Sequence, residues 1–227
     1  LNLAAALVAA GHANALAAGV SCPTGDVILA AQTFIGMQAG VETPSSIGIV
    51  EFPDERGVPF AITDCAVNIR PTAEQLSDIA AASAQTVRSL LSWTPRIAML
   101  SFSTLGSSAC EESERIANAV HCTRERHPSL LVDGEFQLDA AILPEIAARK
   151  VKVPSDVAGQ ANVLVFPDLN AGNIGVKLLQ IFGHATAHGP MLQGFAKPVT
   201  DFSRSAPVEE MLGNLAMLAV RAQSGGK

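Results

Sequence analysis

Short apolar runs and polar turns alternate along this chain, and their spacing separates strands from helices. A run of four to eight apolar residues between turn residues is typical of a buried strand, whereas apolar positions every three or four residues indicate a helix. Residues 162–212 show the order strand, polar turn, helix twice. Upstream we expect strands at 15–20, 46–52, 59–64, 96–102 and 130–132, and helices at 3–10, 26–37, 73–93, 111–126 and 138–150.

Polar residues at the ends of these segments support the assignments. Thr72 and Gln75 have the spacing of a capping box, in which each side chain bonds the backbone N–H of the other. Thr24 is expected to cap the helix that follows it, although the free N–H groups at that junction equally suit an anion. The turn residues 53–57 predict an antiparallel hairpin between their flanking strands, and residues 133–135 are expected as a turn.

Composition indicates a sheet that is covered on both faces. Only 16% of the 227 residues are charged and 48% are hydrophobic, which favours an α/β protein over an exposed sheet. Strands that alternate with helices predict a three-layer α/β sandwich with a mostly parallel sheet. The net charge of -6 argues against binding to nucleic acid, which needs clustered Lys and Arg. No apolar run reaches the length of a membrane span.

Several kinds of site lack a signature in the sequence. The dinucleotide pattern GxGxxG and the nucleophile elbow GxSxG are both absent. His184 and His188 have helical i, i+4 spacing, but Gly183 and Gly189 bracket them in an expected loop, so we predict no metal site. We interpret the four cysteines, which show no ligand spacing, as buried free thiols of a reducing cytoplasm: Cys22, Cys65, Cys110 and Cys122.

A hydroxyl, a permanent cation and two carboxylates come together near the end of the chain. Ser203 and Arg204 precede a predicted helix that carries Glu209 and Glu210 in its first turn. Arg suits a phosphate or an acyl oxygen that gains charge, and a carboxylate can remove a proton from a thiol. Alternatively these residues only start a helix: Ser203 or Ser205 caps it, the glutamates favour its dipole, and Arg204 pairs with one of them. Residue types alone leave both interpretations open.

Five blocks of the chain resemble, in order, successive blocks of the phosphate acetyltransferase (phosphotransacetylase) and phosphate acyltransferase family. FPDLNAGNI and the QGxAKPVxDxSR pattern are the most specific parts of these blocks. The five blocks are ITDCAVNIRPTAEQLSDIA, AMLSFSTLGSSA, DGEFQLDAAILPEIAARK, ANVLVFPDLNAGNIGVKLLQ and GPMLQGFAKPVTDFSRSAPVEEML.

The resemblance covers the C-terminal two-thirds of such an enzyme, and the chain begins with Leu rather than Met, so we expect the natural protein to continue upstream. The resemblance implies an architecture like that of isocitrate and isopropylmalate dehydrogenases. Residues 1–40 with 200–227 would be the remnant of a discontinuous first α/β domain whose N-terminal part is missing, and 41–199 would form the second α/β domain.

The resemblance also implies a reaction, the exchange of an acetyl group between coenzyme A and inorganic phosphate. It implies a cytoplasmic homodimer with no metal and no permanently bound cofactor, which binds acetyl-CoA or CoA as co-substrate together with phosphate or acetyl phosphate. Ser203 and Arg204 match the family's active-site pair, with Ser203 on the thiol or acyl oxygen and Arg204 on the phosphoryl group. Glu210 stands where the family has an Asp that acts as base towards the CoA thiol.

Polar residues in other turns are further candidates. We predict that the following line the substrate cleft, with turn or cap formation as the alternative: Thr24, Ser103, Thr104, Ser107, Asn170 and Asn173.

Two departures from the family pattern keep other functions open. Leu29 and Leu105 stand where the family usually or often has a cation. Their loss would suit a non-catalytic acyl-CoA-sensing domain, whereas the Ser203-Arg204 pair favours an enzyme. Transfer of a longer acyl chain such as butyryl is a third possibility. A dehydrogenase of the isocitrate type is disfavoured because no nicotinamide or metal-ligand signature is present.

Overall fold

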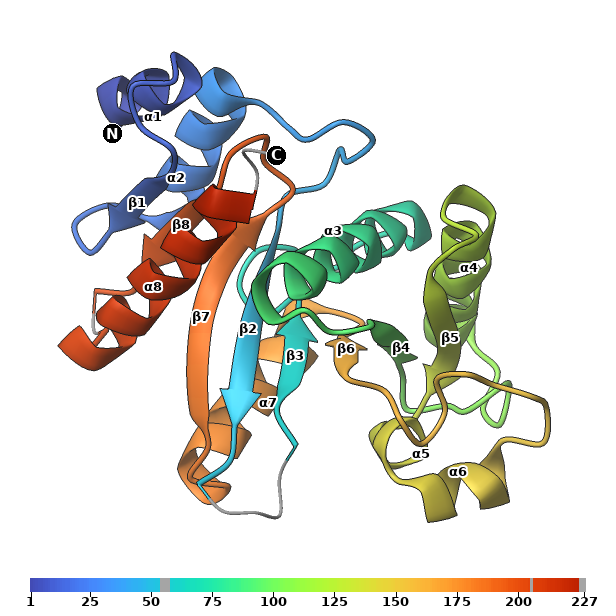
Figure 1. The fold of residues 1–227 in the computed structure, drawn as a ribbon. Helices are drawn as coiled ribbons and strands as arrows, with labels where there is room; N and C mark the ends of the chain where they lie inside the picture. The colour runs from blue at the N-terminus through green and yellow to red at the C-terminus, as the bar shows by residue number, and fades with distance from the viewer. Residues whose placement is uncertain (54–57, 205, 225–227) are drawn as a thin grey trace.

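The computed structural model of this protein describes residues 1–53, 58–204 and 206–224. This part of the chain contains one mixed sheet, whose strands alternate with helices (Figure 1). The strands are β1 (Leu16–Gly19), β2 (Ser45–Glu51), β3 (Phe60–Thr63), β4 (Arg96–Leu100), β5 (Leu131–Phe136), β6 (Val163–Val165), β7 (Thr186–Gln193) and β8 (Val199–Phe202).

The strand order is β1-β8-β7-β2-β3-β6-β4-β5. Neighbours are parallel at both ends of the sheet, in the pair β1–β8 and throughout β3-β6-β4-β5. The middle strands β8, β7, β2 and β3 are joined by antiparallel pairs. The predicted α/β fold with a mostly parallel sheet is confirmed, and the reversals in the middle of the sheet are an additional feature.

Helices cover both faces of this sheet. They are α1 (Asn2–Ala9), α2 (Thr24–Ala30) with the π-helical turn η1 (Ala31–Ile35), α3 (Ala73–Leu91), α4 (Glu111–Arg126), α5 (Leu138–Ile142), α6 (Pro144–Lys150), α7 (Leu169–Phe182) and α8 (Val208–Ser224). In Figure 1 α3 and α8 lie in front of the sheet and α7 lies behind β2 and β3.

Apolar side chains join each face of the sheet to its helices. On one face, Ile47 and Met99 belong to a buried cluster with Ile79 of α3 and Ile116 of α4. On the other face, Ile62 and its neighbours pack with residues of α5 and α7. A third cluster joins α1, β1 and α2 to β7 and β8. The low charge content predicted that both faces of the sheet would be covered, and burial of these apolar side chains is a main driving force of folding.

The first part of the chain meets the last part within the sheet. Leu16 of β1 pairs with Val199 of β8 in parallel register, and α1 packs beside them. This arrangement is compatible with a first domain built from both ends of the chain. The predicted domain bounds, 1–40 with 200–227 and 41–199, stay a prediction.

Local signals gave several element boundaries correctly. The capping box of Thr72 and Gln75 is present at the start of α3. The strands β2 and β3 are antiparallel as predicted, while residues 54–57 of their connecting turn lie outside the described residues. Residues 151–162 form an irregular connection between α6 and β6. Helices α3 and α4 begin and end within two residues of the predicted positions.

Other boundaries were wrong for identifiable reasons. The helix expected at 138–150 breaks at Leu143, because Pro144 has no N–H and starts a new helix. Residues 133–135 belong to β5 rather than to a turn. His188 lies within β7, not in a loop. Thr24 is the first residue of α2 and Pro23 holds the N-cap position. Ser205, the alternative cap of α8, lies outside the described residues.

No helix in the described ranges is long and apolar enough to cross a membrane.

Candidate active site

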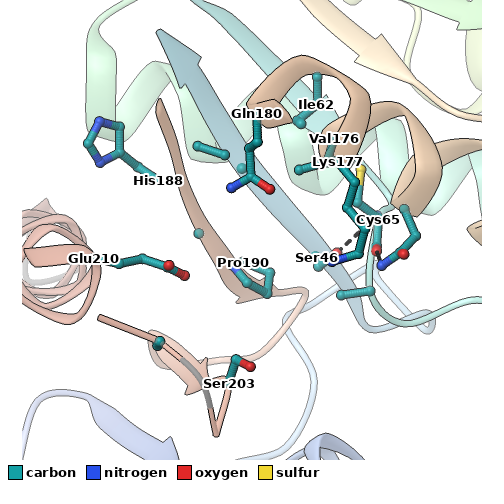
Figure 2. A pocket seen from close by; sticks show the side chains of 16 residues that line it. Ser46, Ile62, Cys65, Val176, Lys177, Gln180, His188, Pro190, Ser203 and Glu210 are labelled. Carbon is teal, nitrogen blue, oxygen red and sulfur yellow. Dashed lines mark hydrogen bonds between the residues drawn. The ribbon is translucent and has the colours of Figure 1, made fainter. Parts of the chain in front are cut away.

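A pocket of about 340 Å³ lies between α7, α8 and the central strands (Figure 2). Ser203 and Glu210 line one side, and Asn173, Lys177 and Gln180 of α7 line the other. A second pocket of about 320 Å³ contains Thr24, Asp201 and Arg204. Ser203 and Pro190 line both pockets, so the two are adjoining parts of one cleft.

The reversed strands of the sheet create the opening of this cleft. Strand β8 pairs with β7 at Met191 and Leu192 and ends at Phe202. Ser203 and Arg204 therefore leave the sheet beside His188 to Pro190, and both are solvent-exposed. The following helix α8 turns back over β7 and β8 and contacts both strands.

Glu210 extends into the cleft from the first turn of α8. Its side chain is half-buried, and this burial raises the pKa of the Glu210 carboxyl, while the charge of nearby His188 lowers it. Figure 2 shows the carboxylate pointing into the pocket, across from Lys177 and Gln180. A carboxylate with a raised pKa is a stronger base than an exposed one.

Helix α7 supplies the opposite wall through one of its faces. Asn173, Lys177 and Gln180 recur at intervals of four and three residues, so they lie on the same side of the helix. Gly172 lets α7 approach closely, since a Cβ there would lie 2.4 Å from the backbone oxygen of Asp64. The Nδ2 of Asn173 donates a hydrogen bond to the carbonyl of Cys65 at 3.3 Å.

The loop after β3 forms the floor of the pocket and is organised by Asp64. This buried carboxylate accepts hydrogen bonds from the backbone N–H groups of Ala66, Val67 and Asn68, at 2.8–3.2 Å, and from the hydroxyl and N–H of Ser46. Burial first, and the Asp64 charge second, raise the pKa of the Cys65 thiol to about 12. Cys65 lines the pocket but is therefore a neutral thiol and a poor nucleophile near neutral pH.

A polar contact ties the start of α2 to the end of β8. The hydroxyl of Thr24 donates a hydrogen bond to Oδ2 of Asp201. Desolvation raises the pKa of the Asp201 carboxyl, and the bond from Thr24 partly offsets this effect. Asp201 is thus a buried anchor beside Arg204, in a position to shape the cleft.

The hydroxyl-rich turn after β4 lies apart from the pocket around Ser203. Ser103 donates to Oε1 of Glu135 at 2.7 Å, and the hydroxyl of Thr104 accepts from the N–H of Gln137 at 3.0 Å. The hydroxyl of Ser107 accepts from the N–H of Thr104 at 3.0 Å. These three side chains organise their own turn, and their predicted substrate contacts stay a prediction.

The other predicted substrate-binding residues divide between two places. Asn173 and Thr24 line the cleft that also contains Ser203. Asn170 lines a different pocket of about 330 Å³, next to Arg70 and Phe102. The structure therefore brings Ser203, Arg204 and Glu210 together with two of the six substrate-binding candidates.

Sequence reasoning did not identify Lys177, Gln180, His188 and Ser46 as part of the cleft. A signal for the first two was present, since they are polar residues with helical spacing in an otherwise apolar segment. Lys177 places a cation close to where anionic substrates would lie. Leu29 and Leu105, where the family resemblance implies a cation, are 63% and 39% exposed. Within the described residues, no group of three or more His, Cys, Asp or Glu could hold a metal ion.

The model of the phosphate acetyl/butaryl transferase family matches residues 1–220. This chain belongs to that family. The phosphate acetyltransferase of Clostridium acetobutylicum is 45% identical over 219 residues, which cover 95% of this chain and 65% of that protein. The Bacillus subtilis phosphate acetyltransferase is 42% identical over 212 residues, 93% of this chain and 64% of that protein. The chain thus spans slightly less than two thirds of these relatives.

Solved structures agree with this assignment. A phosphotransacetylase from Streptococcus pyogenes has a TM-score of 0.90 and 38% identity, over 98% of this chain and 66% of that one. A branched-chain phosphotransacylase from Enterococcus faecalis has a TM-score of 0.78 and 28% identity, over 97% and 78% of the two chains. A 4-hydroxythreonine-4-phosphate dehydrogenase from Klebsiella pneumoniae, with a TM-score of 0.59 and 16% identity, shares the fold alone, over 98% and 69% of the two chains.

Proposed function

We propose that this protein transfers an acetyl group between coenzyme A and inorganic phosphate, in the exchange of acetyl-CoA plus phosphate with acetyl phosphate plus CoA. The observation that supports this most is that Ser203, Arg204 and Glu210 border one cleft, with Lys177 on the facing wall. A cleft with two cations suits a phosphorylated substrate, and a half-buried carboxylate suits removal of a thiol proton.

Each residue has a distinct task in the direction that consumes acetyl phosphate. Arg204 binds the phosphoryl group, and the carboxylate of Glu210 takes the proton from the CoA thiol. The resulting thiolate attacks the acyl carbon and a C–S bond forms, while the C–O bond to phosphate breaks and its electron pair leaves with the phosphate. The Ser203 hydroxyl donates a hydrogen bond to the acyl oxygen as negative charge develops there.

Direct transfer to the thiol fits this cleft better than a covalent acyl-enzyme. The pKa of the Cys65 thiol, about 12, leaves almost no thiolate at neutral pH. We also infer a cytoplasmic homodimer with no permanently bound cofactor, as in the family that the sequence resembles. Light scattering on the purified protein would measure its oligomeric state.

The acyl chain defines a second candidate function within the same chemistry. The likeness to a branched-chain phosphotransacylase favours an assay of longer substrates. Butyryl phosphate consumed faster than acetyl phosphate would reassign the substrate but would leave the roles of Arg204 and Glu210 unchanged.

The decisive experiment measures CoA-dependent consumption of acetyl phosphate by the purified protein. We expect turnover, a loss of about 10²–10³-fold in kcat for Arg204→Ala, and a comparable loss for Glu210→Gln. Arg149→Ala, which removes an exposed cation of α6, is the matched control and should retain full activity. Binding of acetyl-CoA without turnover of acetyl or butyryl phosphate would contradict the proposed enzymatic function and favour a non-catalytic acyl-CoA-sensing domain.

A further inference from the structure

A pocket of about 240 Å³ lies where α3, α8 and the loop 194–198 between β7 and β8 meet. Arg221 of α8 and Lys197 of the loop line this pocket. Of the described residues, none lines both this pocket and the catalytic cleft. Arg221 lies about 16 Å beyond Glu210 along α8, at a rise of roughly 1.5 Å per residue. The pocket is therefore near the opposite end of α8 from the proposed base.

Arg221 has no carboxylate partner in the part of the chain that the structure describes. Its Nη1 donates a hydrogen bond to the carbonyl of Leu192 in β7 at 3.0 Å. Burial lowers the pKa of the Arg221 guanidinium to about 10, which still leaves it charged at neutral pH. A charge that has lost part of its hydration is favoured by a nearby anion. Several other arginines have one, since each pairs with a carboxylate: Arg70, Arg115, Arg124 and Arg126.

Hydrogen-bond donors remain available around this pocket. Within the described ranges, Nε and Nη2 of Arg221 hold no hydrogen bond and are not sealed from solvent. The side chain of Gln38 donates to Oε1 of Gln85, which leaves the amide nitrogen of Gln85 as a further donor at the pocket. Lys197 is exposed and adds a second cation. A planar guanidinium beside an ammonium and an amide is a donor set that suits a phosphate group.

Backbone hydrogen bonds hold the walls of the pocket in place. The N–H of Ala196 donates to the carbonyl of Gly36 at 3.0 Å, directly before Lys197. The N–H of Gln38 donates to the carbonyl of Gly194 at 2.8 Å. Since the loop is already fixed by these bonds, a ligand loses little affinity to the cost of ordering it.

We propose that this pocket binds a phosphate group, with Arg221 as its main contact and Lys197 as the second cation. Pockets for organic ligands usually measure roughly 300–1,000 Å³. The smaller volume here favours inorganic phosphate or a small phosphorylated molecule over a nucleotide. The QGxAKPVxDxSR block would then serve two sites, because it supplies Lys197 to this pocket and Ser203 and Arg204 to the cleft. This inference does not depend on the proposed reaction.

The test resolves the two sites by NMR. Backbone amide signals and the Nε–H signal of Arg221 are followed in ¹H–¹⁵N spectra while inorganic phosphate is added at constant ionic strength. We expect saturable shifts at Gly194, Ala196 and Arg221, which surround the pocket. Sodium chloride at the same ionic strength controls for screening and should give no saturable shift. The signal of Gly189 reports separately on binding in the cleft.

Variants assign the binding to particular side chains. Arg221→Gln should weaken phosphate binding at these signals by about tenfold or more, because hydrogen bonds from a charged group are lost. Lys197→Gln changes an exposed residue and should weaken binding by about threefold. It tests the site even if Arg221→Gln does not fold. Arg149→Gln, which removes an exposed cation of α6, is the matched control and should leave the affinity unchanged.

The outcomes separate this proposal from the proposed reaction. Glycerol 3-phosphate is titrated in the same way: tighter binding than inorganic phosphate indicates an organic phosphate, weaker binding indicates the free ion, and either order supports the site. No saturable shift near Arg221 with either probe, or shifts that chloride reproduces, would overturn the proposal. Equal affinity in wild type, Arg221→Gln and Lys197→Gln would do the same. Saturation near Arg221 in a protein without turnover would support the pocket and remove only the proposed reaction.

Discussion

Asp64→Asn is expected to destabilise the protein by about 3–6 kcal/mol. The Asn amide nitrogen must replace one of two carboxylate oxygens. Oδ2 accepts from the backbone N–H of Asn68 at 2.8 Å and from its Nδ2 at 2.6 Å. Oδ1 accepts from more donors, among them Ser46 and Ala66. Placing the amide nitrogen at Oδ2 loses the fewer bonds, and two hydrogen bonds to a charged group contribute about 1.5–3 kcal/mol each.

Urea unfolding, followed by circular dichroism, would measure this loss. Asp156→Asn makes the same chemical change at an exposed site and should alter the unfolding free energy by less than about 0.5 kcal/mol. Asp64 also holds Ser46 and Cys65 at the pocket. The activity of Asp64→Asn should therefore fall by more than the decrease in the fraction of folded protein explains. A destabilisation below about 1 kcal/mol would refute the argument that this carboxylate organises the loop.

Two further predictions concern packing and pH. Gly172→Ala should lower the free energy of unfolding by about 3 kcal/mol, because its Cβ would meet the Asp64 backbone oxygen at 2.4 Å. Gly25→Ala is the control, since there is open space at that position. Urea unfolding of this variant should show an unchanged free energy of unfolding or an increase of up to about 1 kcal/mol. The pKa of Glu210 is raised in the folded protein, so its contribution to stability is present below the ordinary pKa and lost as pH rises through the folded value. Glu210→Gln should therefore gain stability relative to wild type between pH 4 and pH 8 in urea unfolding, and a change in the opposite direction would contradict the burial argument.

The fold was largely predictable because helix and strand signals are local. The capping box of Thr72 and the apolar period that follows it involve residues within one helix, so the sequence contains the whole signal. We predicted one helix at 138–150 where the structure has two, α5 and α6. Pro144 is a local signal for the break at Leu143, but the apolar period continues across the proline and favoured a single helix. The antiparallel pairing of β7 with β2 joins segments more than one hundred residues apart, which no local pattern encodes.

From the sequence, only those members of the candidate site that lie within one short segment could be grouped together. Ser203, Arg204 and Glu210 lie within eight residues, and the family resemblance implies the roles that we propose for them. His188 was assigned to a loop, since Gly183 and Gly189 read as breakers of regular structure. Its neighbours come from β2 and α8, so its surroundings exist only after the sheet has formed.

The antiparallel centre of the sheet explains why the cleft combines these residues. In a fully parallel sheet, loops at one edge would supply the ligand contacts. Here the reversal of β7 sets His188 to Pro190 beside the end of β8, and α7 and α8, which come before and after β7 and β8, close the two sides. The proposed base Glu210 and the cation Lys177 therefore reach the cleft from two different helices. The distance between Glu210 and Lys177 is consequently set by the packing of α7 and α8 on the sheet, and a change such as Gly172→Ala, which pushes α7 outward, should reduce activity through this separation as well as through stability.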